Sequence, residues 1–226
     1  MQMGTQAGGA ARRRVMLLGA GGHASDVLGL IERINLQEPT WDVIGIADDS
    51  AVPKLDRFVN RNIPFLGTID EALARHPDVE FLATVGFPAG RRLVAERAER
   101  SGCAAATLVD PRAIVAPNVA IGAGSVVMGG SYLSALVGIG RHVYVSALVV
   151  IGHDTLVGDY SSLMPGAMIC GDAVLGSDVL IGANATVLQG ARVLEGASVG
   201  AGSVARRVAA GATVSSIMAK RRLRVA

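Results

Sequence analysis

The sequence predicts a short Rossmann-like α/β domain with a parallel sheet, followed by an all-β domain of stacked coils. A glycine-rich turn between an apolar segment and a helical stretch, at Gly19–Ala24, predicts the first domain. An aliphatic residue at every sixth position of the C-terminal half predicts the second. We therefore expect four segments: a disordered lead-in (residues 1–11), an α/β domain (12–107), a repeat domain (108–214) and a basic tail (215–226).

Strand and helix signals alternate through the first domain. Arg14–Leu18 has the apolar character of a buried strand, and the glycine-rich turn leads into a helix from Ser25 to Ile34. Thr68 and Glu71 have the spacing of a capping box at the start of a second helix. The remaining expected elements are strands at Val43–Ala47 and Phe81–Val85 and helices at Ile69–Arg75 and Arg91–Arg100.

The glycine-rich turn is a candidate phosphate site. In a strand, turn and helix arrangement, backbone N–H groups near Gly21, Gly22 and His23 can meet a phosphate at the helix start. Asp48 and Asp49 end the next strand, where carboxylates can accept hydrogen bonds from a ribose or a base. The domain is half the size of a dinucleotide fold, which favours a mononucleotide over NAD. Ordinary packing of a helix against a strand remains the alternative reading of the glycines.

The six-residue period defines the second domain. A helix would repeat at three, four and seven residues, so the period indicates short strands separated by tight turns, with the aliphatic side chains pointing into a narrow prism. Small or β-branched residues follow four places after each aliphatic residue, and Gly, Asn and Asp crowd the turns. The sixteen aliphatic positions are Val109, Val115, Ile121, Val127, Leu133, Ile139, Val145, Ile151, Val157, Leu163, Ile169, Leu175, Ile181, Val187, Val193 and Val199.

Composition favours a small-molecule partner in the cytoplasm. The net charge of +2 argues against nucleic acid and against an anionic membrane surface. Cys103 and Cys170 lack the spacing of a zinc site or a disulfide framework, which fits a reducing compartment. The stretch Ala113–Gly140 has no charged residue, yet its regular Gly, Ser and Asn positions continue into charged sequence, so we expect a soluble repeat and no membrane insertion.

A glycine-rich α/β domain followed at once by hexapeptide repeats resembles the hexapeptide-repeat sugar acyltransferases of the sialic acid O-acetyltransferase and nucleotide-amino-sugar N-acetyltransferase family. The likeness spans Arg14 to Val214. It implies a left-handed parallel β-helix with three hexads per coil, hence about five coils from sixteen hexads. A prism with three flat faces and small, uncharged turns such as Met128–Ser131 should associate by its sides into a homotrimer. The resemblance also implies acetyl-CoA as cosubstrate, a nucleotide-linked amino sugar as acceptor, and a role in polysaccharide biosynthesis.

The resemblance assigns the catalytic residues. His153 corresponds to the general base, which imidazole suits because its ordinary pKa lies near neutrality. Asp154 corresponds to its acidic helper, and Gly171, eighteen residues after His153, to the N–H donor for the thioester oxygen. Coenzyme A is expected along the adjoining corner, at the stacked Ala183 and Ala201 as well as Gly171. Ser162 stands where the family has a histidine that contacts coenzyme A, and no metal is implied.

Four departures from the family pattern leave the acceptor open, at Ser134, Ser146, Gly152 and Ser162. The alternatives are therefore a sugar O-acetyltransferase of the same fold and an inactive trimeric scaffold that binds a nucleotide. A β-helix carbonic anhydrase would need three histidines, and the repeats contain only two, His142 and His153. An NAD-dependent oxidoreductase would leave the repeats unexplained.

Overall fold

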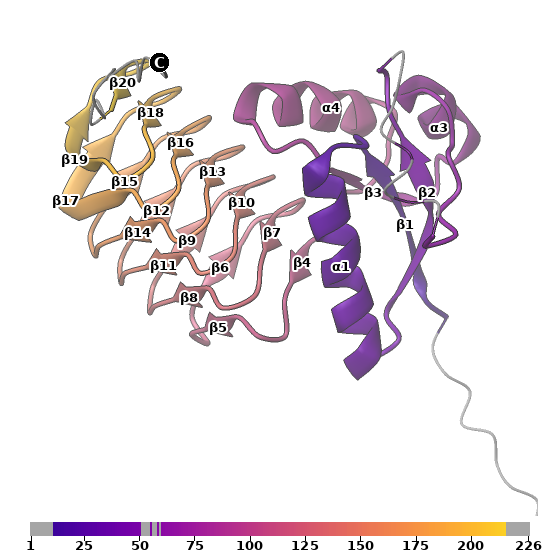
Figure 1. The fold of residues 1–226 in the computed structure, drawn as a ribbon, viewed down its shortest axis with the longest axis horizontal. Coiled ribbons are helices and arrows are strands. Elements are labelled where there is room, and N and C mark those ends of the chain that lie inside the picture. The colour runs from indigo at the N-terminus through magenta and orange to yellow at the C-terminus, as the bar shows by residue number, and fades with distance from the viewer. Residues whose placement is uncertain (1–10, 51–54, 56–57, 59, 216–226) are drawn as a thin grey trace, which may run out of the picture.

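The computed structural model describes residues 11–50, 55, 58 and 60–215 of the 226-residue chain. The expected lead-in and basic tail, apart from Ala11 and Ser215, lie outside the described residues. A three-stranded sheet with its helices stands beside a stack of short parallel strands (Figure 1). Among the described helices, none has the length and apolar character needed to cross a membrane.

The α/β part is a parallel sheet of strand order β2-β1-β3, with helices on both faces. Alternate residues of β1 point to opposite faces, so Val15 and Leu17 pack with α1, whereas Met16 and Leu18 pack with α3 and α4. The elements are β1 (Arg13–Leu18), α1 (Gly22–Gln37), β2 (Trp41–Ala47), α3 (Ile69–Arg75), β3 (Glu80–Ala83) and α4 (Pro88–Arg100).

All six elements expected from the sequence are present, and two helices begin earlier than expected. α1 begins at Gly22 and not at Ser25, which places the last glycine of the turn inside the helix. α4 begins at Pro88, whose fixed φ suits the first helical position. The bounds of α3 are as expected, and its capping box is confirmed: Thr68 and Glu71 each bond the other's backbone N–H, at 3.3 and 2.9 Å.

The C-terminal part is a parallel β-helix with three faces. Strands pair with strands eighteen residues further on, as Tyr144 pairs with Ser162, so three hexads make one coil. The first face consists of β4 (Leu108–Val109), β7 (Val126–Val127), β10 (Tyr144–Val145), β13 (Ser162–Leu163), β16 (Leu180–Ile181), β18 (Ser198–Val199) and β20 (Thr213–Val214). The second face begins with β5 (Ile114–Val115), β8 (Tyr132–Leu133), β11 (Val150–Ile151) and β14 (Met168–Ile169). The third begins with β6 (Ala120–Ile121), β9 (Gly138–Ile139), β12 (Leu156–Val157) and β15 (Val174–Leu175).

Two longer strands complete the second and third faces, because β17 (Thr186–Val193) and β19 (Val204–Val208) each run from one face to the next. We call the turns between the first and second faces the first corner, those between the second and third faces the second corner, and those between the third and first faces the third corner. The expected aliphatic positions form one continuous core, in which all sixteen residues are buried or partly buried.

The expectation of about five coils is wrong, because the repeat continues beyond Val199. The first face has seven strands, and Ala205, Val208 and Val214 extend the core. The last coil is also shorter than the others. Val187 pairs with Ala205, eighteen residues on, whereas Val193 pairs with Val208, only fifteen residues on. Three residues are therefore missing from the last coil at the second corner.

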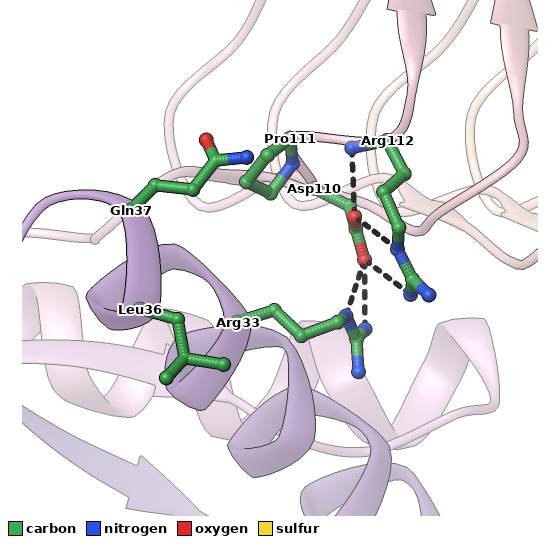
Figure 2. A pocket seen from close by; sticks show the side chains of 6 residues that line it. All are labelled: Arg33, Leu36, Gln37, Asp110, Pro111 and Arg112. Carbon is green, nitrogen blue, oxygen red and sulfur yellow. Dashed lines mark hydrogen bonds and ion pairs between the residues drawn. The ribbon is translucent and has the colours of Figure 1, made fainter.

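The two parts share one interface, since the first face of the β-helix packs on the α/β part. Val126, Met128 and Tyr144 belong to the same buried cluster as the apolar side of α1. At the end of α1, the buried carboxylate of Asp110 lies between Arg33 and Arg112 beside a cavity of about 190 Å³ (Figure 2). Burial alone would raise the pKa of Asp110, but hydrogen bonds from both arginines lower it to about 2. This ion-paired cluster fixes the first coil to α1.

Candidate active site

His153 lies at the second corner, in the turn between β11 and β12. Its Nδ1 is 2.8 Å from Oδ2 of Asp154, and both side chains are about half exposed. Asp154 has a φ of 57°, a left-handed conformation that an aspartate tolerates in a tight turn. When Nδ1 donates to this carboxylate, Nε2 keeps its lone pair, as a general base requires.

Gly171 lies on the next coil at the same corner, which confirms the eighteen-residue stacking expected for this pair. A Cβ at position 171 would stand 2.6 Å from Nε2 of His153, so only a glycine leaves room for the imidazole. The neighbouring Asp172 donates its N–H to the carbonyl of His153 at 2.9 Å, which holds the two turns together. In the described part of the chain the N–H of Gly171 has no acceptor. One polar donor and one base therefore meet at this corner.

Asp172 is a site residue that the sequence analysis missed. Its carboxylate, the ring of His153 and the carboxylate of Asp154 have ligand atoms within 4.8 Å of one another. Asp172 is eighteen residues after Asp154, so the arithmetic that predicted Gly171 could have found it. The corner thus carries two carboxylates beside one imidazole.

The residues expected to contact coenzyme A lie in two different places. Ala183 and Ala201 are stacked at the first corner, where Gly202 donates its N–H to the carbonyl of Ala183 at 2.8 Å. The second face separates them from Gly171. Ser162 requires a correction. Its side chain is fully buried on the first face, donates to the carbonyl of Gly86 and accepts from Arg91, both at 2.8 Å. A side chain with no exposed surface cannot contact a cosubstrate, so we remove Ser162 from the candidate site.

A cavity of about 430 Å³ opens at the carboxyl ends of β1, β2 and β3, where ligands bind in sheets of this kind. It brings together four predicted residues: Gly21, Gly22, His23 and Asp48. Gly21 caps α1 without a side-chain hydrogen bond, so the first N–H groups of the helix lack a capping side chain. A Cβ at Gly21 would meet nothing within 4 Å, hence this glycine leaves open space.

The two predicted aspartates differ in their surroundings. Asp48 accepts the N–H groups of Ala20 at 2.5 Å and of Ser50 at 2.7 Å. Burial alone would raise the pKa of Asp48, but these hydrogen bonds outweigh it and hold the pKa below its ordinary value. Asp49 accepts the N–H of Ile69 at 3.0 Å, pairs with Arg97 and lines only an adjoining cavity. Asp48 is therefore the better candidate for contact with a ligand.

His23 stands neutral in the wall of this cavity. Its ring lies 4.0 Å from the ring of Tyr144, and its Nδ1 is buried without a hydrogen bond. Burial, with a smaller contribution from the charge of Arg91, lowers the pKa of His23 to about 3. Because Nδ1 has no exposed surface, a ligand in the cavity would reach it only if the surrounding side chains moved.

The segment after β3 completes the cavity and was not foreseen. Thr84, Val85, Gly86 and Phe87 line its far side, and the side chain of Phe87 is 65% exposed. The position of this segment at the carboxyl end of β3, beside β1, was the available signal.

Arg91 fixes that segment to the β-helix and was also missed. Its guanidinium is buried and donates to the carbonyls of Val85 and Gly86 at 2.8 and 3.0 Å. It also donates to the carbonyls of His142, Tyr160 and Ser161 at 2.6 to 2.9 Å. Burial lowers the pKa of Arg91 to about 10, which leaves it charged at neutral pH. No local sequence pattern marks a buried arginine whose acceptors, with Ser162, lie on six separate residues.

His142 is buried and does not have the exposure that a catalytic base needs. It is fully buried at the third corner, where its ring stacks on Tyr160 at 5.3 Å. It has no acidic neighbour in the sequence, but α4 supplies Glu99, 2.9 Å from its Nε2. Its role is to join the two parts of the protein.

The fold is that of the hexapeptide-repeat acyltransferases. Residues 14–98 match the family model of the PglD N-terminal domain. A search of curated proteins gives no significant match.

Two solved acetyltransferase structures are similar over most of their length. The acetyltransferase domain of PglB from Neisseria gonorrhoeae FA1090, in complex with acetyl coenzyme A, is 27% identical with a TM-score of 0.81, covering 91% of this chain and 97% of that one. PerB from Caulobacter crescentus, in complex with CoA and GDP-perosamine, is 25% identical with a TM-score of 0.79, covering 95% and 97%. WeeI from Acinetobacter baumannii AYE shares the fold, with 22% identity and a TM-score of 0.77 over 90% and 97%. These matches confirm the resemblance to nucleotide-amino-sugar acetyltransferases.

Proposed function

We propose that the protein transfers the acetyl group of acetyl-CoA to the amino group of a nucleotide-linked amino sugar. The amine attacks the thioester carbon while His153 takes a proton from the nitrogen, so a carbon–nitrogen bond forms. The N–H of Gly171 stabilises the negative charge on the thioester oxygen. Collapse of the intermediate breaks the carbon–sulfur bond, and coenzyme A leaves with the proton that His153 returns.

One observation carries this proposal: the Nε2 of His153 lies beneath Gly171, while Asp154 engages Nδ1 at 2.8 Å. This arrangement supports acyl transfer, which needs a base and an N–H donor beside each other. Asp154 and His153 are both exposed at a corner that the α/β part leaves uncovered, so a thioester can approach.

The cavity at the edge of the sheet suits the nucleotide of the acceptor. The start of α1 favours a phosphate, Asp48 can accept from a hydroxyl or an amino group, and the exposed ring of Phe87 can stack on a base. The similar PerB structure contains GDP-perosamine, a nucleotide-linked amino sugar, together with CoA. This supports the same class of acceptor here.

The proposal also includes a homotrimer. The α/β part packs on the first face (Figure 1). His153 lies in the turn between β11 and β12, at the second corner, which is the corner opposite that face. The cavity and the base of one subunit therefore face different directions, and a neighbouring copy is needed to bring them together. The second face supports association, since its outward residues Ile114, Tyr132, Met168 and Val204 are 44 to 64% exposed.

The test is acetyl-CoA turnover against a panel of UDP-, GDP- and dTDP-linked amino sugars, with the matching hydroxyl sugars as controls. We expect turnover with one amino sugar nucleotide and an amide product that resists hydroxylamine. An ester product that hydroxylamine cleaves would establish O-acetylation instead. Binding of a nucleotide sugar without any turnover would identify a scaffold.

A further inference from the structure

The turns of the second corner, including the turn of His153, form a column along the β-helix. The last coil is shortened at this corner, and the column ends in basic residues. Along the second corner, His153, Gly171 and Gly190 lie on successive coils, connected by backbone hydrogen bonds of 2.9 Å. On the last coil, only Arg206 and Arg207 stand between the inward residues Ala205 and Val208. The coil below has five residues, 188–192, at the same place. The column of turns therefore ends one coil early, and two exposed arginines occupy its end.

A third arginine joins them. Arg192 pairs in register with Arg207, and both line a cavity of about 390 Å³ with Leu194, Val208 and Ala209. One terminal nitrogen of Arg192 donates to the carbonyls of Asp172, Ala191 and Gly190 at 2.8, 3.0 and 3.3 Å, so its guanidinium lies at the second corner. None of the three arginines has an ion-pair partner among the described residues.

Positive charge is confined to this end of the third face. On the lower coils, the outward positions of that face carry no charge: Ala120, Gly138, Leu156 and Val174. The corner beside them carries the carboxylates of Asp154 and Asp172 near the base. A ligand with a neutral reactive end and an anionic distal end would therefore align with the anionic end toward the three arginines.

We propose that Arg192, Arg206 and Arg207 bind the phosphate groups of coenzyme A. This inference rests on the proposed function. From the coil of His153 to the last coil there are three strand spacings, or roughly 14 Å at ~4.8 Å each. The arm of coenzyme A between sulfur and the nearest phosphate has about thirteen bonds, which span roughly 15 Å in an extended chain. With the thioester at His153, the phosphates reach the arginines, whose planar guanidinium groups bind phosphate oxygens in pairs.

The test compares two acyl donors that share the thioester and the arm but differ in phosphate content: acetyl-CoA and S-acetylpantetheine. Arg207→Gln, alone and with Arg206→Gln, should raise the KM for acetyl-CoA about tenfold, because a charged hydrogen bond is lost, and leave kcat nearly unchanged. The kinetics with S-acetylpantetheine should stay the same. Arg100→Gln makes the same change of charge at an exposed position on α4 and should affect neither donor.

Equal KM values for acetyl-CoA in the wild type and Arg207→Gln/Arg206→Gln would overturn the assignment and leave the proposed function intact. So would a parallel rise for both donors. Calorimetric titration of the intact protein with coenzyme A, without acceptor, separates the two proposals further. A wild type that binds coenzyme A tenfold more tightly than the double variant supports the site even if no sugar acceptor is found. A wild type that binds no coenzyme A contradicts both.

Discussion

The imidazole of His153 and the backbone of Gly171 occupy the same corner on adjacent coils, so close that a Cβ on Gly171 would lie 2.6 Å from Nε2 and 2.7 Å from Cε1. Gly171→Ala should therefore push the ring out of line and lower kcat about a hundredfold, the usual effect of a displacement of this size. The ring is exposed and can move, so the melting temperature should change little. Gly102→Asn, at an open left-handed position after α4 and away from this corner, is the matched control. Full activity of Gly171→Ala would show that the contact has no role.

Asp154 positions the base through its hydrogen bond to Nδ1. Asp154→Asn keeps the shape but allows the opposite tautomer, so kcat should fall about ten- to a hundredfold with the KM values nearly unchanged. Asp172→Asn is the control, because it removes a neighbouring charge that makes no hydrogen bond to the ring among the described contacts. Equal losses in the two variants would show that the local charge matters and the orientation of the ring does not.

Arg91 connects the cavity segment to the β-helix through carbonyls on both parts. Arg91→Met leaves those buried acceptors without a donor, which should cost about 3 kcal/mol or more, or roughly 10 °C in Tm. Its neighbour Arg92 is the control, since it is one-third exposed, pairs with Asp178 and stacks on Tyr160. Arg92→Met should cost less than about 1 kcal/mol. Thermal unfolding of both variants checks the contrast, which a similar Tm would contradict.

Acid should destabilise the protein through His23, whose pKa of about 3 lies below the ordinary value of 6.5. A histidine with a lowered pKa binds fewer protons when folded, so unfolding takes up protons and stability falls as the pH drops below 6.5. The loss between pH 7 and pH 5 should be about 2 kcal/mol. His23→Phe keeps a ring on Tyr144 but does not titrate, so this part of the loss should disappear. Denaturant unfolding at both pH values measures it, and an equal loss in the two proteins would contradict the assignment.

The six-residue period correctly predicted the core of the β-helix, because inward aliphatic residues at every sixth position stack into one continuous core. The same arithmetic placed Gly171 above His153. It could not show that Ser162 is buried, because Ser162 is an outward residue of the first face and is covered only by the α/β part that packs there. The burial of Arg91 and His142 depends on the same interface between distant segments. The shortened last coil was not predicted, because its three missing residues interrupt the six-residue period on which the prediction depended.

The most direct test of the mechanism is the turnover of His153→Ala with acetyl-CoA and the amino sugar nucleotide found in the panel. Removal of a positioned general base should lower kcat about a hundredfold or more. The side chain is half exposed in a turn and opens no cavity in the core, so the Tm and the oligomeric state should be unchanged. Wild-type turnover by His153→Ala, with an intact oligomer, would contradict the assignment of His153 as the base.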